Sequence, residues 1–278
     1  LREAGYLKEK DGALWFGDPQ EVEEEDRVVI RSNGQPTYFA SDLGYLLSRF
    51  EQRGFHRVIE VWGADHHGYV PRMTAAMSAL GHPPGAFHAI VHQLVHLFRG
   101  KEAVKMSKRA GEFVTLRELA EMAGVDACRF FFAMRSPNAH MNFDVELARK
   151  KTNENPVFYV QYVHARIASI FREAAARGLS GGTPDWSLLT DPAEKALLVK
   201  AAWLPAALAA CEKELSPHPL PTYLMELAGL YHPFYEKCRV LDPDDRARTA
   251  ARLALCGGVK TVIAEALGLL GVSAPEEM

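Results

Sequence analysis

Residues 56–68 read HRVIEVWGADHHG, an apolar run that breaks into a polar turn bounded by two glycines. The run from Arg57 to Trp62 predicts a buried β-strand that ends at Gly63. Apolar residues recur at helical spacing before it, in residues 42–54, and after it, in residues 70–82. This order of helix, strand and helix is typical of the crossover unit of a parallel sheet, whose ligands bind beyond the carboxyl ends of the strands. The polar turn is therefore a candidate site.

The pattern changes from about Asn153 onward, where long amphipathic segments follow one another without a strand pattern. In residues 155–178, Pro156 lies near the start of a predicted helix and Gly178 lies after its end, as helix termini favour. Loops rich in proline, glycine, serine and threonine separate this helix from two or three more. The sequence therefore predicts a helical bundle in this part of the chain.

With 278 residues, 48% of them hydrophobic, the chain is long enough for two ordinary domains. We expect an α/β domain over residues 1–152, followed by an all-α domain over residues 153–278. The formal net charge is −3, and both signs are interspersed. This balance excludes a histone-like basic protein but allows local basic patches that bind a polyanion.

The cysteines and the apolar runs indicate a protein of a reducing compartment. The four cysteines lie far apart and form no Cys-x-x-Cys pair, which favours reduced thiols over a disulfide framework or a zinc site. They are Cys128, Cys211, Cys238 and Cys256. No apolar run approaches the roughly 20 residues of a membrane span, and nothing at the start resembles a signal peptide. We expect a cytoplasmic protein with no membrane partner and no structural metal.

A basic stretch stands out at residues 104–111, which read VKMSKRAG. Its lysines and serine fall on a short predicted loop between an apolar run and a predicted helix. Such a loop can neutralise the charge of a polyphosphate while one of its bonds breaks. The alternative is a solvated basic turn, because a bare Lys-x-x-Lys is common.

Two further stretches carry residues suited to a charged ligand. In residues 36–45, Tyr38 and Asp42 are four positions apart and share a face if the helix has begun by then, so that they could accept the donors of a guanidinium. The alternative is that Asp42 caps a helix and Tyr38 packs in the core. In the turn GADHHG, Asp65 can accept from ribose hydroxyls and the histidines can donate or accept near neutral pH. Solvated turn residues are the alternative there.

Three histidines, His88, His92 and His96, recur every four residues in HAIVHQLVHLF. On a helix this spacing would put three imidazoles on one face as metal ligands. The stretch is rich in Ile, Val, Leu and Phe and leads into a loop, so we predict a strand and no metal site.

Several of these stretches together resemble a known family. They are DGALWF, PTYFASDLGYLLSRFEQRGF, VWGADHHGYVPR, VKMSKRAGEFVTL, NPVFYVQYVHARI and LGLLGVSAPEEM. The KMSK letters downstream of a strand, GADH and a helix resemble the second half of a class I aminoacyl-tRNA synthetase catalytic domain. The details are similar to arginyl-tRNA synthetase over essentially the whole chain. The resemblance implies a Rossmann-type catalytic part followed by an α-helical anticodon-binding bundle.

The resemblance implies that the family uses ATP, with Mg²⁺, to activate arginine and then transfers the arginyl group to its tRNA. The positions that match the arginine-binding residues are Tyr38, Asp42 and His66. Those that match the nucleotide side of the pocket are Gly63, Asp65, His67 and Met106. Those that match the catalytic loop, which closes over the phosphates, are Lys105, Ser107 and Lys108.

The helical part resembles the anticodon-binding domain of the family. Tyr159, Tyr162 and Arg166 share a helix face by their spacing, and aromatic rings beside a guanidinium suit stacking on unpaired bases. The alternative is that both tyrosines belong to the core. The resemblance also places Met278 near the anticodon. It implies that residues 115–150 form a helical connection that rests against the inner side of the bend of the tRNA. We expect a monomer.

One expected motif is absent. Class I synthetases carry an earlier HIGH-type motif that holds the ATP phosphates on the side opposite the KMSK stretch, residues 105–108, which we call the lysine loop. No such motif precedes Tyr38. We therefore expect a carboxyl-terminal fragment of an arginine-tRNA ligase that is inactive by itself. The alternative is a non-catalytic tRNA-binding module or paralogue derived from a class I synthetase.

Overall fold

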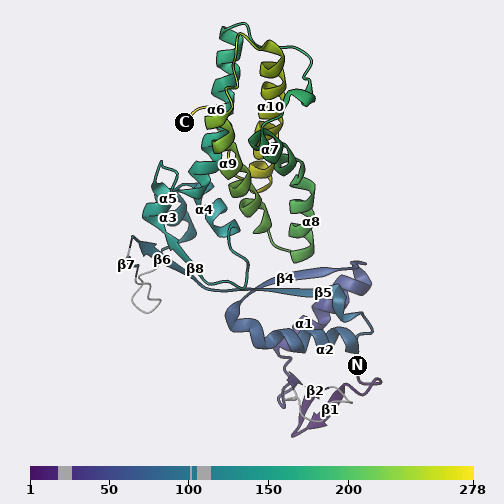
Figure 1. The fold of residues 1–278 in the computed structure, drawn as a ribbon. Coiled ribbons are helices and arrows are strands. Elements are labelled where there is room, and N and C mark those ends of the chain that lie inside the picture. Colours follow the sequence, from purple (N-terminus) through teal and green to yellow (C-terminus); the bar gives the residue numbers. More distant parts are fainter. Residues whose placement is uncertain (18–26, 101, 105–113) are drawn as a thin grey trace. The chain divides into compact units, whose positions relative to one another are not determined.

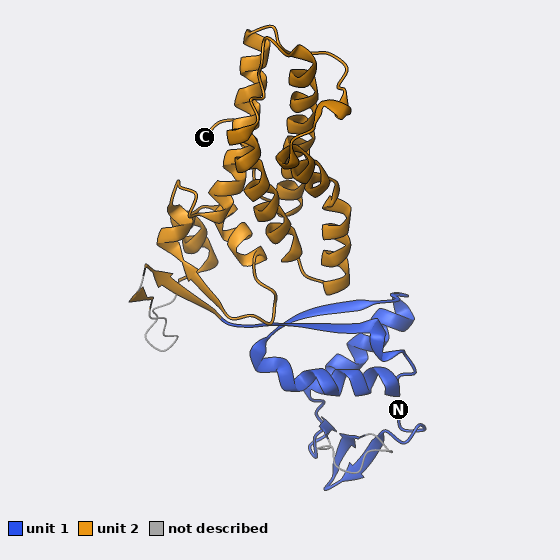
Figure 2. Cartoon of the chain, viewed as in Figure 1, with its two compact units in different colours: residues 1–94 blue, residues 95–278 orange. Residues whose placement is uncertain are grey.

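The computed structural model describes the 278-residue chain except for residues 18–26, 101 and 105–113 (Figure 1). It divides into two compact units, residues 1–94 and residues 95–278, which Figure 2 shows in two colours. The predicted boundary near residue 152 falls inside the second unit.

The first unit begins with a three-stranded antiparallel sheet in the order β1–β2–β3. Its strands are β1 (Leu7–Lys10), β2 (Ala13–Phe16) and β3 (Arg27–Ile30). Asp11 and Gly12 form the turn between the first two strands, and both have positive φ angles, of 52° and 72°. An Asp-Gly pair favours this conformation, because the right-handed twist of a hairpin requires positive φ at both central positions.

The predicted crossover unit follows and is confirmed. Its elements are α1 (Tyr38–Leu47), a π-helical turn (Ser48–Gln52), β4 (Val58–Gly63), a 3₁₀ turn (Ala64–Tyr69), α2 (Val70–Ala79), a short 3₁₀ turn (Pro84–Ala86) and β5 (Phe87–His92). β4 and β5 pair in parallel, with Val58 opposite Phe87 and Gly63 opposite His92. The candidate turn therefore begins at the carboxyl end of a parallel strand, as expected.

The core of the first unit lies between its strands and helices. Leu46, Met73 and Met77 are at most 2% exposed. The rings of Phe16 on β2 and Phe39 on α1 meet edge to face, with centroids 5.4 Å apart. Each such buried side chain stabilises the fold by about 1.5–3 kcal/mol. Because these contacts join the small sheet to α1, they hold the start of α1 in place.

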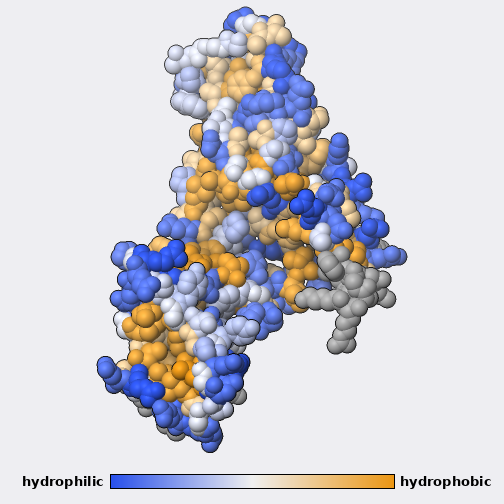
Figure 3. All heavy atoms as spheres, turned by 180° about the vertical axis from the view of Figure 1, so that it is seen from behind, coloured by the Kyte–Doolittle hydropathy of each residue, from blue (hydrophilic) through white to orange (hydrophobic). Residues whose placement is uncertain are grey.

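The prediction of a buried strand at residues 57–62 holds for only one face of β4. Val58, Glu60 and Trp62 are buried or half-buried on one face, whereas Ile59 and Val61 on the other face are 45% and 64% exposed. The exposure of these two apolar side chains shows that, among the described residues, no layer of the first unit covers this face. Figure 3 shows hydrophobic residues gathered in patches on the visible surface of the molecule.

The second unit begins with a three-stranded sheet in the order β7–β6–β8. Its elements are β6 (Val95–Arg99), β7 (Glu102–Ala103), α3 (Leu116–Ala123), α4 (Val125–Ala133), β8 (Met141–Asp144) and α5 (Val145–Arg149). The stretch with three histidines is extended rather than helical, as predicted, but it forms two strands, with His88 and His92 on β5 and His96 on β6. The described residues contain no group of three or more His, Cys, Asp or Glu side chains that could hold a metal ion.

The remaining chain is helical from Pro156 onward, as predicted. The helices are α6 (Pro156–Ala176), a 3₁₀ turn (Trp186–Leu188), α7 (Pro192–Ala202), α8 (Leu204–Glu214), α9 (Pro219–Lys237) and α10 (Arg246–Leu269). Their core contains fully buried side chains from α6, α9 and α10, such as Ile167, Leu224 and Ile263. No helix among the described residues is long and apolar enough to cross a membrane. The expected fold class, α/β followed by all-α, is confirmed.

The stability of this bundle should decrease in alkali because of Tyr223 on α9. Burial raises the pKa of its phenol to about 12, whereas an unfolded tyrosine ionises near pH 10. The folded state therefore keeps a proton that the unfolded state loses, so this contribution is full below about pH 10 and is lost as pH rises toward about 12.

We expect the free energy of unfolding, measured by urea titration, to fall less steeply above about pH 10 in Tyr223→Phe than in the wild type. The variant loses the hydroxyl's bonds to the carbonyls of Lys200 and Ala201 (3.0 and 3.1 Å), so it is less stable at neutral pH. Equal slopes would show that Tyr223 ionises as freely in the folded state as in the unfolded state.

Candidate functional site

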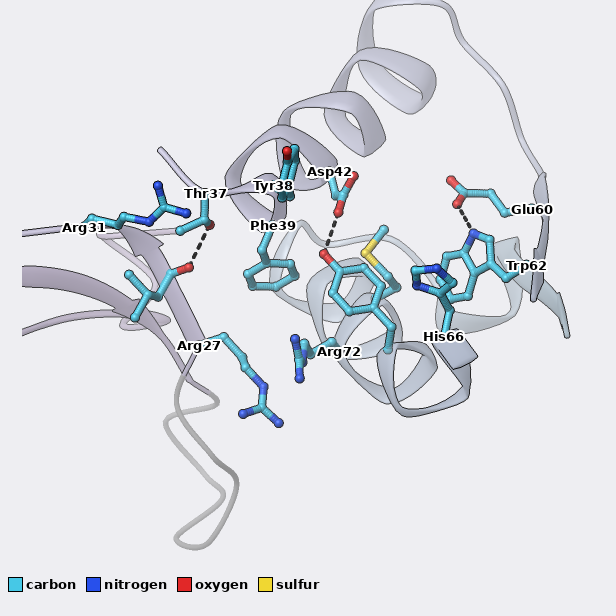
Figure 4. A pocket seen from close by; sticks show the side chains of 13 residues that line it. Arg27, Arg31, Thr37, Tyr38, Phe39, Asp42, Glu60, Trp62, His66 and Arg72 are labelled. Atoms are coloured by element: carbon cyan, nitrogen blue, oxygen red, sulfur yellow. Dashed lines mark hydrogen bonds between the residues drawn. The ribbon is translucent and has the colours of Figure 1, made fainter. Parts of the chain in front are cut away.

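A pocket of about 510 Å³ lies within the first unit, beside the carboxyl end of β4 (Figure 4). It is lined from β3, α1, β4, the 3₁₀ turn and α2. The lining residues that carry polar groups are Arg27, Arg31, Thr37, Tyr38, Asp42, Glu60, Trp62, His66, Tyr69 and Arg72. The structure thus brings together the three residues predicted to bind arginine, Tyr38, Asp42 and His66.

Thr37 fixes where α1 begins. Its hydroxyl oxygen accepts the backbone N–H of Ala40 (3.4 Å) and donates to the carbonyl of Val28 on β3 (2.8 Å). A threonine in this position satisfies one of the unpaired N–H groups of the first helical turn. α1 therefore begins at Tyr38, and Tyr38 and Asp42 lie one turn apart on the same face.

The alternative for these two residues does not hold. The side chain that caps the helix is that of Thr37, not Asp42. Tyr38 is 88% exposed, so it does not pack in the core. Both side chains are instead available at the pocket, as Figure 4 shows.

Asp42 is oriented by Tyr69. The phenol of Tyr69 donates a hydrogen bond to Oδ2 of Asp42 across the pocket. Burial, and then the hydrogen bond to this carboxylate, raise the pKa of Tyr69 well above its usual range, so the phenol remains a donor. Among the described residues, no hydrogen bond is made to the other oxygen of Asp42. A cationic ligand can therefore bind a carboxylate that is already held in position.

The second carboxylate of the pocket, Glu60 on β4, is already satisfied. It forms an ion pair with Arg49 and accepts the indole N–H of Trp62 (2.9 Å). The guanidinium of Arg49 lies over the ring of Tyr45, 3.7 Å from its centroid. Glu60 therefore positions Trp62 as a wall of the pocket, and Asp42 is the acid that is open to a ligand.

Three guanidinium groups, from Arg27, Arg31 and Arg72, also line the pocket. That of Arg72 lies over the ring of Tyr69, 5.1 Å from its centroid. A pocket with an oriented carboxylate and several guanidinium groups suits a ligand that carries both a cation and an anion.

The turn after β4 presents its polar groups to solvent. The side chains of Asp65 and His66 are 83% and 63% exposed, and Oδ2 of Asp65 lies 3.8 Å from Nε2 of His66. A Cβ atom on Gly63 would lie 2.6 Å from Oδ1 of Asp65, so the missing side chain lets this carboxylate fold back over the strand end. Gly63, Asp65 and His67 lie beside the pocket rather than in its lining. Met106 and the three predicted catalytic residues, Lys105, Ser107 and Lys108, lie outside the described residues.

Sequence reasoning missed several lining residues, notably Glu60 and Trp62. The sequence could have indicated both, because Glu60 is a charged residue in an otherwise apolar strand and Trp62, two positions later, lies on the same face of that strand. Tyr69 gave no such signal, because its partner Asp42 lies 27 positions earlier in the chain.

A second hollow, of about 380 Å³, lies between α6 and α9 in the second unit. Tyr162 and Arg166 line it together with His232 and Tyr235. The rings of Tyr162 and His232 are stacked, with centroids 6.3 Å apart and planes at 16°. Arg166 donates to the hydroxyl of Tyr235, and its guanidinium lies 4.6 Å from the centre of that ring. Burial lowers the pKa of His232, which favours the neutral imidazole.

The other two residues predicted to bind tRNA lie elsewhere on the helical part. Tyr159 is half-buried, packs against the core and contacts the ring of His232 (centroids 4.7 Å apart), and it does not line the second hollow. Met278 is 55% exposed and lines a third hollow. His232 and Tyr235 were missed, although their spacing on α9 places both on one face.

Family models match most of the chain. The model of the class I tRNA synthetase catalytic domain of type R covers residues 1–145, and the model of the DALR anticodon-binding domain covers residues 160–278. The expected order, a class I catalytic part followed by a helical anticodon-binding domain, is therefore confirmed.

Individual relatives agree with these models. The chain is 53% identical over its full length to an arginine–tRNA ligase from Elusimicrobium minutum, and 49% identical to one from Carboxydothermus hydrogenoformans. It covers 52% and 50% of these proteins, and so spans about half the length of the curated relatives it matches.

Solved structures have the same fold. A Campylobacter jejuni protein assigned as an arginyl-tRNA synthetase is 32% identical, with a TM-score of 0.87, and is matched over 100% of this chain and 60% of its own. The Thermus thermophilus arginyl-tRNA synthetase, at 23% identity, shares the fold with a TM-score of 0.78; the match spans 100% of this chain and 56% of that one. With a catalytic-domain model over more than half of its residues and relatives at about 50% identity, the chain belongs to the arginyl-tRNA synthetase family of class I tRNA synthetases.

Proposed function

We propose that this chain supplies the arginine pocket, the lysine loop and the tRNA-binding bundle of an arginine–tRNA ligase. The observation that carries the proposal is the carboxylate of Asp42, which Tyr69 holds at an open pocket. The names of the relatives support it. We further propose that residues 1–152 form the catalytic part and residues 153–278 the anticodon-binding part, and that the protein works as a cytoplasmic monomer.

In this proposal the substrate arginine binds with its guanidinium against Asp42. The hydroxyl of Tyr69 already donates a hydrogen bond to one oxygen of Asp42. The guanidinium N–H groups of the substrate arginine would donate to the same carboxylate. Tyr38 and His66 lie at the same pocket and contribute further polar contacts. The guanidinium groups of the lining favour the end of the substrate that carries its carboxylate.

ATP would bind next to this pocket at the turn after β4. The missing side chain of Gly63 lets the Asp65 carboxylate lie over the strand end, where it can accept from the ribose hydroxyls, and His67 can donate to the nucleotide. Met106 is proposed to contact the same nucleotide. Mg²⁺ would accompany ATP, held mainly by phosphate oxygens and water, as is usual for this ion.

The reaction has two steps in this proposal. A carboxylate oxygen of arginine attacks the α-phosphorus of ATP, the bond to the bridging oxygen breaks, and pyrophosphate leaves. A terminal ribose hydroxyl of tRNA then attacks the carbonyl carbon, and AMP leaves. Lys105, Ser107 and Lys108 are proposed to neutralise the charge that develops on the phosphates in the first step.

The tRNA would bind the helical part through its anticodon loop. Tyr162 and Arg166 combine a ring with a guanidinium at the hollow between α6 and α9, which suits stacking on an unpaired base. Tyr159, whose ring contacts His232 beside this hollow, and Met278, which lines the third hollow, are proposed to contribute to tRNA binding as well. The match of residues 160–278 to an anticodon-binding domain supports this assignment.

A chimera tests the proposal. We would replace the matching half of the Elusimicrobium minutum arginine–tRNA ligase with this chain and measure exchange of pyrophosphate into ATP with each of the twenty amino acids and tRNA. Of the twenty amino acids, only arginine should support the exchange of pyrophosphate into ATP. In parallel, arginine and tRNA binding by the 278-residue chain would be measured directly, so that a chimera that fails to fold does not decide the result. Binding without exchange in a folded chimera would indicate a non-catalytic tRNA-binding module.

In the same chimera, Lys108→Ala should slow adenylate formation roughly a hundredfold, because the ammonium stabilises charge that exists only in the transition state. The arginine dissociation constant, measured without ATP, should not change. Lys108→Arg is the matched control that keeps the charge. An equal loss in binding and rate would contradict the proposed role.

A further inference from the structure

The carboxyl-terminal segment, residues 271–278, is held against the helices by side chains rather than by secondary structure of its own. It follows α10 at Gly271, whose φ of +66° ends the helix. Val272 is 4% exposed and anchors the start of the segment in the core. Beyond Val272, the described contacts of the segment backbone are made by polar side chains of α4 and α6.

The first set of contacts joins Ser273 to Asp126 and Gln161. Oδ1 of Asp126 accepts the backbone N–H of Ser273 (3.1 Å), and its Oδ2 accepts the hydroxyl of the same residue. The side-chain amide N–H₂ of Gln161 donates to Asp126 (2.9 Å) and to the carbonyl of Ser273 (2.9 Å). Both partners of this amide group are acceptors, so its orientation is fixed. Gln161 is 8% exposed, which makes the loss of these bonds costly.

His164, one turn further along α6, holds the next part of the segment. It is 3% exposed, and its Nδ1 lies 2.8 Å from the carbonyl oxygen of Pro275. Because a carbonyl can only accept, His164 must carry its proton on Nδ1. Beyond it, Arg172 donates to the carbonyl of Glu276 (3.3 Å), and Lys260 donates to the Glu276 carboxylate (2.6 Å).

The end of the segment forms one wall of the third hollow, of about 730 Å³. Lys150 and Lys151 line the hollow with Phe158, Gln161 and Met278. The ring of Phe158 stacks on Tyr162 of the second hollow, with centroids 6.3 Å apart and planes at 18°. Lys150 is paired with Glu154, and the acidic residues Asp126 and Glu277 also line the hollow. The ammonium of Lys151, which forms no ion pair among the described residues, the ring of Phe158 and the thioether of Met278 form the part of the surface suited to the phosphate and base of an unpaired nucleotide.

We propose that Asp126, Gln161 and His164 are positioning residues for RNA binding. They fix residues 273–278 so that Met278 forms a wall of the third hollow, which receives an unpaired nucleotide of the tRNA. This inference rests on the proposed function and deepens it. Without these bonds the segment would have to be ordered at the moment of binding, and the entropy lost would weaken the affinity.

The test uses the 278-residue chain and two measurements. Hydrogen exchange of residues 273–278 reports the position of the segment without RNA. Fluorescence anisotropy with an arginine-tRNA transcript reports affinity. His164→Leu should speed exchange in the segment and weaken tRNA binding about tenfold. His164→Asn, whose amide can donate in the place of Nδ1, should restore both. Gln161→Leu should behave like His164→Leu.

Removal of residues 275–278 separates positioning from a general loss of structure. In the shortened chain His164→Leu should have no further effect on affinity, because the segment that it positions is gone. The proposal fails if His164→Leu frees the segment while tRNA affinity is unchanged, or if the effects of shortening and of His164→Leu add. A wild-type chain that does not bind the transcript would refute the proposed function itself, and the inference with it.

Discussion

Replacing Asp42 by asparagine is expected to weaken arginine binding by about 3–4 kcal/mol, a factor of several hundred. Asp42 is the pocket carboxylate that keeps an oxygen without a hydrogen bond among the described residues, and Glu60 is already paired with Arg49. An asparagine has nearly the same shape, but it has no charge and presents an N–H₂ group that cannot accept from a guanidinium. Calorimetric titration of arginine into the chain measures the loss.

Citrulline is the matched ligand for this prediction, because it has the shape of arginine without the charge. The wild type should prefer arginine strongly, and Asp42→Asn should bind the two ligands with similar affinity. Tyr69→Phe is the matched variant: it removes the donor that orients Asp42 and keeps the ring, so its loss should be much smaller. If Asp42→Asn binds arginine as tightly as the wild type, Asp42 does not belong to the arginine site.

The crossover unit could be predicted from the sequence because its signals are local. Strand and helix periodicity, with glycines after the elements, identified α1, β4 and α2 within a few residues. The spacing of Tyr38 and Asp42 also sufficed to place them on one face. Which residue caps α1 was not decided by spacing. Thr37 has that role because its hydroxyl also reaches the carbonyl of Val28 on a strand of the small sheet.

The parts that could not be predicted depend on contacts between distant positions. Tyr69 orients Asp42 across 27 positions, and Asp126 meets Ser273 across 147. Each of these side chains is polar and would also be compatible with an exposed surface, so no periodicity distinguishes it. The exposed face of β4 was missed for a related reason, since an apolar strand pattern does not reveal how many layers cover it.

The largest effect on stability is expected at a buried ion pair of the helical bundle. Glu194 on α7 is 0% exposed, and its Oε1 accepts from Nε of Arg252 on α10 (2.6 Å). Its other oxygen accepts the backbone N–H of Asp191 (2.8 Å), and Arg252 also donates to the carbonyl of Arg239 (2.8 Å). Both charges are therefore satisfied only as long as both partners are present.

Arg252→Met should lower the free energy of unfolding by about 3–5 kcal/mol, because it leaves the Glu194 carboxylate buried without its cation. Urea unfolding followed by far-ultraviolet circular dichroism, which reports the helices, measures the change. Replacing both residues by methionine should recover most of the loss, since the apolar pair removes both charges, although the bond to Asp191 is lost. Arg177→Met breaks an exposed pair with Glu173 and is the control, with little change expected. If Arg252→Met were no worse than Arg177→Met, the carboxylate of Glu194 would have to reach water or a proton in the folded state. The pair would then contribute nothing to holding α7 against α10.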